Sequence, residues 1–297
     1  ASIKANHPEA YVETGDIRKI DPVEFGKNLK SAPNVILGGP SCQGFSTSGG
    51  LSRMSGRNID DERNSLFLDF VRFVDALRPE WVVMENVPGL LMFNRGIVAE
   101  EIIKQFRVAG YHVAPMILLA ADFGVPQLRR RLFFIGHRLQ QSIAFPAPTH
   151  GNDELWKNFA LPFAHLSKIG NKTEAKQLLD HVSFEEACGD LPSIELGGKI
   201  EEKHFYLSPP QSQYQGLMRN RSRKVSLHCA SNLSEFVKAA MLHINCGENW
   251  TKLPANLKTG RYLKIRPYDA TTLLRRLVAH KPAYTINTKF NDATTGA

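Results

Sequence analysis

Cysteine is scarce in this chain, and long apolar runs are missing from it. The four cysteines among 297 residues lie far apart and form no C-x-x-C pair, which excludes a disulfide framework and a cysteine-based zinc site. The histidines show no metal-ligand spacing. No apolar run approaches the ~20 residues that a membrane span needs. These absences predict a cytoplasmic protein without a metal or a membrane partner.

The net charge of +8 is concentrated in one part of the chain. Residues 190–281 contain 15 Lys and Arg against 7 Asp and Glu, whereas the rest of the chain holds 22 of each sign. A localised basic excess is typical of a surface that binds a phosphate backbone. A merely solvated basic face would carry the same charge, so both interpretations stay open on charge alone.

A cysteine follows the first predicted buried strand. Residues 34–37 are apolar and partly β-branched, and two glycines and a proline end the strand before Cys42. In an open α/β sheet, ligands bind at the carboxyl ends of the strands. A thiol there is either a nucleophile, where its thiolate is stabilised, or a small buried apolar side chain. Position alone does not decide between the two.

Two further motifs stand at strand boundaries. Glu85 follows a second apolar strand, residues 81–84, and is a candidate acid or base, with a surface glutamate opening a turn as the alternative. The third strand, residues 132–136, is preceded by an arginine-rich run. If that run is extended, one of its faces carries Gln127, Arg129 and Arg131.

Three motifs in this order resemble those of the cytosine-C5 DNA methyltransferases of bacterial and archaeal restriction-modification systems. They are Pro-Ser-Cys-Gln-Gly-Phe-Ser, Glu-Asn-Val and Gln-x-Arg-x-Arg, and the resemblance covers nearly the whole chain. It implies a Rossmann-like α/β fold with a doubly wound, mostly parallel sheet and a smaller, irregular target-recognition domain. The alternation of strands and helices along the first half of the chain favours the same sheet.

The resemblance and the changes in composition predict four parts. Residues 1–149 form the catalytic core, which ends where Pro146-Ala147-Pro148 changes the composition. Residues 150–189 connect it to the target-recognition region, residues 190–281, and residues 282–297 return to the core.

Catalytic roles follow from the resemblance for the residues that match the motifs. Cys42 would add to carbon 6 of a flipped-out cytosine, which makes carbon 5 reactive. Glu85 would hydrogen-bond ring N3, and Arg131 would bind the cytosine O2 and orient Glu85. Supporting roles fall to Arg129, Gln127 and Asn86, the last as a brace for the loop or the base.

The cofactor that the resemblance implies is S-adenosylmethionine. Asp16 follows a short predicted strand, and taken alone it is more typical of a turn or a helix cap than of a ligand. The matching Asp of the family lies by the adenine of the cofactor. The implied cofactor contacts are Asp16, Ile17, Pro40, Ser41 and Leu66.

Double-stranded DNA is the partner that the resemblance implies, with a cognate restriction endonuclease as a functional partner and the prokaryotic nucleoid as the location. Residues 43–63 hold four serines, four glycines and no core periodicity, and in the family this loop closes over DNA. Candidate DNA contacts in the loop are Gln43, Ser46, Ser48 and Arg57. Those in the target-recognition region are Arg219, Arg221 and Arg223.

Two family motifs have no match among the 297 residues. One is the glycine-rich first motif with the acidic residue that holds the ribose, and the other is the final Gly-Asn motif. We expect the missing sheet edge and pocket walls to come from the rest of a longer chain or from a second subunit. A smaller departure is Ser41, where the commonest family pattern has a second proline.

Two alternative functions remain open from the sequence. An RNA cytosine-C5 methyltransferase would carry the same three motifs, although the large basic region favours duplex DNA. A non-catalytic DNA-binding remnant would explain the missing first motif, but drift would not be expected to spare Cys42, Glu85 and Arg131 together.

Overall fold

The computed structural model describes residues 2–41, 66–139, 141–151, 178–195, 197–200, 204–220, 222–225, 228–267 and 273–286. These residues separate into two compact units. The first contains the described residues up to Leu118 together with 130–147, and the second contains residues 119–129 and the described residues from Pro148 onward. The short segment 119–129 therefore groups with the C-terminal part of the chain, while the four-part division stays a prediction.

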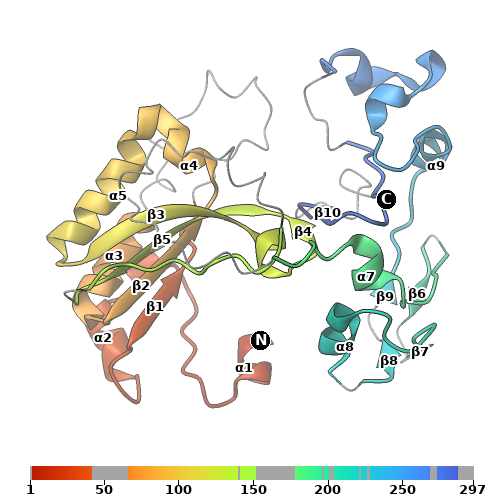
Figure 1. The fold of residues 1–297 in the computed structure, drawn as a ribbon. Helices are drawn as coiled ribbons and strands as arrows, with labels where there is room; N and C mark the ends of the chain where they lie inside the picture. The colour runs from red at the N-terminus through yellow and green to blue at the C-terminus, as the bar shows by residue number, and fades with distance from the viewer. Residues whose placement is uncertain are drawn as a thin grey trace. The chain divides into compact units, whose positions relative to one another are not determined.

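The first unit is built on a four-stranded sheet with the order β1-β2-β5-β3 (Figure 1). Its strands are β1 (Val35–Gly38), β2 (Trp81–Asn86), β5 (Arg130–His137) and β3 (His112–Leu119). β1 runs parallel to β2, with Val35 opposite Trp81, whereas β5 runs antiparallel to β2, with His137 opposite Trp81. β3 and β5 also run in opposite directions, because the Ala120 amide bonds the Arg129 carbonyl while Gly136 lies against His112 at the other end.

The predicted α/β class is confirmed, but the doubly wound, mostly parallel sheet is not. Only the β1–β2 pairing is parallel among the neighbouring strands of this sheet. The physical reason lies in the chain between β3 and β5, which has only ten residues, 120–129. Parallel neighbours need a crossover of a dozen or more residues, so this short connection returns the chain antiparallel.

One face of the sheet is covered by helices α3 (Leu66–Leu77), α4 (Gly89–Met92) and α5 (Ile97–Val108). The buried side chains of α3 recur at helical spacing: Phe67, Phe70, Val71 and Val74. They share a core with the alternate residues of β2 and β5 that point to the same face, such as Met84 and Phe134. This packing fixes the sheet against which the candidate site is built.

The other face of β1 is open in the described structure. Leu37 is 71% exposed and Val35 is 47% exposed, although the sequence predicts a buried strand here. β1 is the outermost strand in the order of the sheet, so only one of its edges pairs with a neighbour among the described residues. Its apolar character is therefore not explained by the packing within this unit.

Short elements make up the second unit. β4 (Gln127–Leu128) pairs parallel to β10 (Ala283–Tyr284), β6 (Lys199–Ile200) pairs with β9 (His228–Cys229), and β7 (His204–Phe205) pairs with β8 (Lys224–Val225). The helices are α7 (Phe184–Cys188), α8 (Gln213–Arg219) and α9 (Glu235–Met241). Trp250 and Tyr262 centre a small apolar core beside α9. Within the described parts of the chain, no helix has the length and apolar character that a bilayer crossing requires.

Candidate active site

Glu85 lies near the carboxyl end of β2, next to the carboxyl end of β1. The parallel register places Gly38 opposite Met84, so the chain leaving β1 passes Glu85 directly. A Cβ atom placed on Gly39 would lie 3.4 Å from the Glu85 Oε2. The two strand ends therefore lie side by side, and Ser41 is the last described residue before Cys42.

Arg131 forms an ion pair with Glu85. The Arg131 Nε donates to the Glu85 Oε1 at 2.7 Å, and the Arg131 Nη1 donates to the Arg130 carbonyl at 2.8 Å. Because Glu85 is opposite Phe133, Arg131 is its diagonal cross-strand neighbour on the same face of the sheet. The side chains of Arg131 and Glu85 are 22% and 40% exposed, so a bound ligand can reach both.

Asn86 links the end of β2 to the segment before Cys42. Its side chain is only 4% exposed. The Asn86 Nδ2 donates to the Pro40 carbonyl at 3.2 Å, and its Oδ1 accepts from the Val87 amide at 2.9 Å. The side chain therefore holds the backbone two residues before the cysteine.

The arginine-rich run does not form one continuous strand. Gln127 belongs to β4 and pairs with Ala283, and the strand is interrupted at Arg129. The Arg129 Nη1 donates to the Ile286 carbonyl at 3.3 Å. Gln127 and Arg129 thus contact the segment 283–286, whereas Arg131 binds Glu85.

Asp16 caps a short 3₁₀ helix, η1 (Ile17–Lys19), and is held by Arg18. Its carboxylate accepts from the Arg18 amide at 3.1 Å, from the Arg18 Nε at 3.0 Å and from the Arg18 Nη2 at 2.6 Å. These hydrogen bonds from Arg18 lower the pKa of Asp16 to about 2. The carboxylate is therefore ionised at neutral pH and offers acceptor oxygens only.

The predicted cofactor contacts lie on helix α3 and on two segments that contact it. Arg72 of α3 donates to the carbonyl of Ile17, which lies in the same turn as Asp16. At the end of β1, a Cβ on Gly38 would lie 2.3 Å from the Phe70 ring, so only glycine lets the strand end approach α3 this closely before Pro40 and Ser41 follow. Leu66 is the first described residue of α3. The turn of Ile17 and the end of β1 therefore both contact helix α3, on which Leu66 also lies.

The chemistry of the predicted cofactor contacts fits the adenosine end of S-adenosylmethionine. An ionised carboxylate at Asp16 can accept from an exocyclic amine, and Leu66 offers apolar surface. Gly15 has a φ of +150°, and no atom lies within 4 Å of the place where its Cβ would stand. The backbone beside Asp16 therefore borders open space among the described atoms.

Some predicted residues lie outside the described residues. These are Cys42, Gln43, Ser46, Ser48, Arg57 and Arg221.

The side chain of Arg219, a predicted DNA contact, is largely buried and paired within the second unit. Its Nε donates to the Asp190 Oδ2 at 2.8 Å, its Nη2 contacts the same carboxylate, and its guanidinium lies 3.9 Å above the Tyr206 ring. The two side chains of the pair are 10% and 3% exposed. Asp190 is 29 residues away in the chain, so no local pattern could have indicated this pair.

Sequence reasoning missed an exposed aromatic residue beside basic side chains. Phe205 is 67% exposed, and the Lys224 Nζ lies 5.0 Å from its ring centroid across the β7–β8 pair. Arg223, which was predicted to contact DNA, is exposed next to Lys224. An aromatic residue in a two-residue strand, with no apolar alternation around it, was the available signal.

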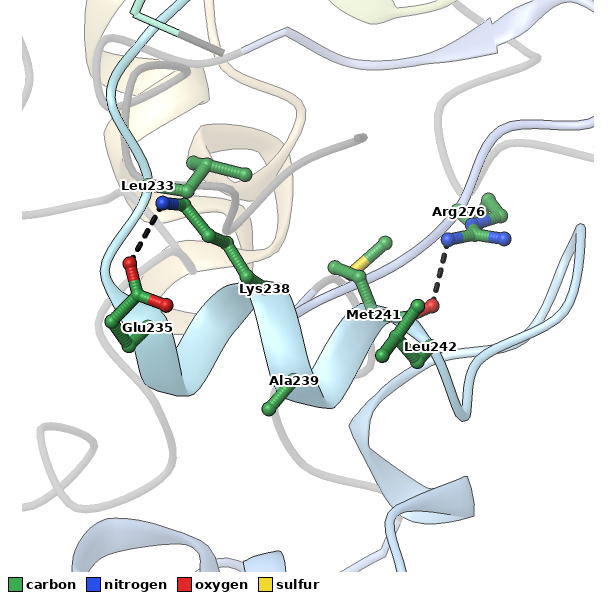
Figure 2. Close-up of a pocket in the computed structure, with 7 residues that line it drawn as sticks. All are labelled: Leu233, Glu235, Lys238, Ala239, Met241, Leu242 and Arg276. Atoms are coloured by element: carbon green, nitrogen blue, oxygen red, sulfur yellow. Dashed lines mark hydrogen bonds and ion pairs between the residues drawn. The ribbon is translucent and has the colours of Figure 1, made fainter.

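A pocket of about 580 Å³ lies along α9 in the second unit. Figure 2 shows its lining, in which Arg276 donates to the Met241 carbonyl and Lys238 pairs with Glu235. The remaining lining residues are Leu233, Ala239 and Leu242. None of the predicted catalytic or cofactor residues lines this pocket, and its ion pair joins neighbouring turns of one helix, with the Glu235 side chain 89% exposed.

Comparisons with known proteins agree with the motifs. The chain is 32% identical over 270 residues to the Type II methyltransferase M.AgeI of Thalassovita gelatinovora, covering 88% of this chain and 59% of that protein. It is 38% identical over 234 residues to the Type II methyltransferase M.DdeI of Desulfomicrobium norvegicum, covering 76% of this chain and 48% of that protein. The chain thus spans about half to three fifths of the length of these relatives.

A solved structure shares the fold. It is a prophage-encoded protein of E. coli assigned as a DNA modification methyltransferase, with a TM-score of 0.56, 20% identity, and coverage of 91% of this chain and 68% of that one. The family model described as C-5 cytosine-specific DNA methylase matches residues 2–252. The chain therefore belongs to the C-5 cytosine-specific DNA methylase family.

Proposed function

We propose that the protein transfers a methyl group from S-adenosylmethionine to carbon 5 of a flipped-out cytosine in a specific site of duplex DNA. The observation that carries the proposal is the Glu85–Arg131 pair, which stands beside the strand end that leads to Cys42. Membership of the family supports the reaction type. An acid, a guanidinium and a thiol at one strand end are the groups that this reaction needs.

In this mechanism the Cys42 thiolate forms a bond to carbon 6 of the cytosine. Electron density moves toward ring N3, where Glu85 shares a proton, and carbon 5 becomes enamine-like. Arg131 binds the O2 oxygen and orients Glu85. After carbon 5 has taken the methyl group, a base removes its proton and the Cys42 thiolate leaves, which regenerates both ring and enzyme.

The residues of the chain also prepare the site. Asn86 holds the Pro40 carbonyl and thereby orients the segment before Cys42. The target base is inaccessible in a duplex and must flip out at a cost of a few kcal/mol. The loop containing Gln43, Ser46, Ser48 and Arg57 would fill the gap in the duplex and exclude water from the site.

Asp16, Ile17, Pro40, Ser41 and Leu66 would hold the cofactor, which supplies an electrophilic methyl group when bound. The first two would bind the adenine edge through the ionised carboxylate and the backbone. A further sheet edge from the rest of a longer polypeptide, or from a second subunit, would complete the site. The exposed apolar side chains of β1 support this part of the proposal, since Leu37 and Val35 would pack against the added structure.

Duplex DNA would bind the basic region, residues 190–281, through residues such as Arg223 and Lys224. A cognate restriction endonuclease would act on the same site, and both proteins would work on DNA in the cytoplasm. The names of the relatives, which are Type II methyltransferases, favour this pairing.

The proposal is tested by transfer of labelled methyl groups to DNA and to RNA by the full-length protein. We expect 5-methylcytosine in duplex DNA and none after Cys42→Ser. Label in RNA alone would replace the proposal by the RNA alternative, and label in neither polymer would indicate a non-catalytic remnant.

A further inference from the structure

Arg72 connects helix α3 to the turn that carries Asp16. It lies in the second turn of α3, where it is a cationic residue among apolar neighbours. Its Nη1 donates to the Ile20 carbonyl at 2.9 Å, and its Nη2 donates to the Ile17 carbonyl at 2.8 Å. One side chain therefore binds both ends of the turn formed by residues 17–20.

The Arg72 guanidinium is itself held in place. Its Nη2 also donates to the Asp69 Oδ1 at 3.2 Å, one helical turn earlier, and its centre lies 5.3 Å from the centroid of the Phe73 ring. A guanidinium fixed by a carboxylate and an aromatic ring loses little further freedom when it bonds the two carbonyls. The Arg72 side chain, which we call the clamp because it holds both ends of the turn, is therefore preorganised on the helix.

The turn has few contacts of its own to stabilise it. Helix η1 has only three residues and buries none of them, and its cap is the Asp16–Arg18 interaction on the surface. A short 3₁₀ turn with little apolar burial opens readily. The two hydrogen bonds from Arg72 are long-range contacts, 52 and 55 residues away in the chain, that tie this turn to the core helix.

We propose that Arg72 is a positioning residue for cofactor binding, which acts through the turn of Asp16 and Ile17 without touching the cofactor. This inference rests on the proposed function, which assigns the adenine contacts to Asp16 and Ile17. Arg72 ties that turn to α3, the helix that also carries Leu66. Loss of the clamp lets the turn open, so the adenine contacts must be ordered again when the cofactor binds.

The chain offers a matched control in Arg78. Its Nη1 pairs with Asp75 three residues earlier, at 3.2 Å, and donates to the Ala109 carbonyl at 2.6 Å, and its guanidinium stacks over the Tyr111 ring. Arg78 thus has the same kinds of partner as Arg72 but clamps a different turn. Its loss should affect stability without reaching the turn of Asp16.

The test compares Arg72→Met, Arg72→Lys and Arg78→Met in the full-length protein. Binding of S-adenosylhomocysteine is measured by calorimetry, and amide hydrogen exchange is followed for residues 17–20. We expect Arg72→Met to weaken binding about tenfold and to speed exchange in the turn, because charge-assisted hydrogen bonds are lost. Arg72→Lys retains one donor group, so its affinity should lie between that of the unaltered protein and that of Arg72→Met. Arg78→Met should change affinity less than about twofold.

Two results would overturn the inference in different ways. Unchanged affinity of Arg72→Met, with faster exchange in the turn, would show that the clamp does not serve the cofactor and would leave the proposed function intact. Absence of binding by the unaltered protein would remove both the cofactor assignment and the inference that depends on it.

Discussion

The two oxygens of Glu85 face different partners, because Oε1 accepts from the Arg131 Nε at 2.7 Å while Oε2 lies toward Gly39. Arg131 therefore holds Oε1 and leaves Oε2 directed at the segment that leads to Cys42. In the proposed reaction this second oxygen is the one that meets ring N3. In the proposed reaction Arg131 would thus orient the Glu85 carboxyl group toward the base.

Glu85→Gln should slow methyl transfer by about two to four orders of magnitude, the usual range for a positioned general acid. Binding of S-adenosylhomocysteine should stay near normal, because Glu85 is not among the residues proposed to hold the cofactor. Single-turnover methylation kinetics measure the first effect and calorimetry the second. A variant that keeps the parental rate would exclude Glu85 from the chemistry.

Asn86→Ala should destabilise the protein by about 1–3 kcal/mol, since it removes a buried donor and acceptor and leaves the Pro40 carbonyl without this partner. The rate of methyl transfer should fall as well, because the segment before Cys42 loses its brace. Denaturant unfolding and single-turnover kinetics measure the two effects. A stability loss without any rate loss would limit Asn86 to a structural role.

Arg219 and Arg223 should respond in opposite ways to substitution. Arg219→Met leaves Asp190 buried without its partner, so we expect a loss of about 3–5 kcal/mol in the free energy of unfolding. Reversing Arg221 and Arg223 to Glu should leave stability nearly unchanged, but it should weaken DNA binding and flatten its salt dependence by roughly one unit per lost phosphate contact. An unchanged salt dependence of DNA binding would show that Arg221 and Arg223 do not contact DNA.

Asp16 should stabilise the folded protein at neutral pH and lose this effect in acid. Hydrogen bonds from Arg18 lower its pKa in the folded protein to about 2, below the ordinary value of 3.8. The stabilisation is therefore complete above the ordinary pKa and is lost as the pH falls from about 4 toward 2. Thermal unfolding of the parent and of Asp16→Asn should differ by a constant amount from pH 5 to 8 and converge below pH 4. A difference that changes near neutrality would contradict the assigned pKa.

Local patterns explain the strands that border the candidate site, but not the topology of the sheet. One apolar strand is followed by glycines and the other by Glu85 and Asn86, and both are short-range signals. In the structure the ends of these two strands adjoin. The insertion of β5 between β2 and β3 is a pairing between distant segments, and hydrophobic spacing carries no information on its direction.

The positions of several charged side chains also depend on contacts between distant parts of the chain. Arg129 does not share a site with Arg131, because it donates to the Ile286 carbonyl. The Arg219 side chain is largely buried because it pairs with Asp190. The carbonyl partners of Arg72, on Ile17 and Ile20, lie more than fifty residues away in the chain. In each case a long-range hydrogen bond decides where a charged side chain lies, and a single sequence contains no record of such pairs.

The most direct test of the central claim is trapping of the Cys42 adduct. A duplex oligonucleotide with 5-fluorocytosine at the target position carries a fluorine that cannot leave as a proton, so the reaction should stop after methyl transfer. With S-adenosylmethionine present, the full-length protein should form a denaturant-resistant complex that peptide mapping assigns to Cys42, and Glu85→Gln should form it about two to four orders of magnitude more slowly. Absence of the complex on the cognate site, or a complex that persists after Cys42→Ala, would contradict covalent catalysis by Cys42.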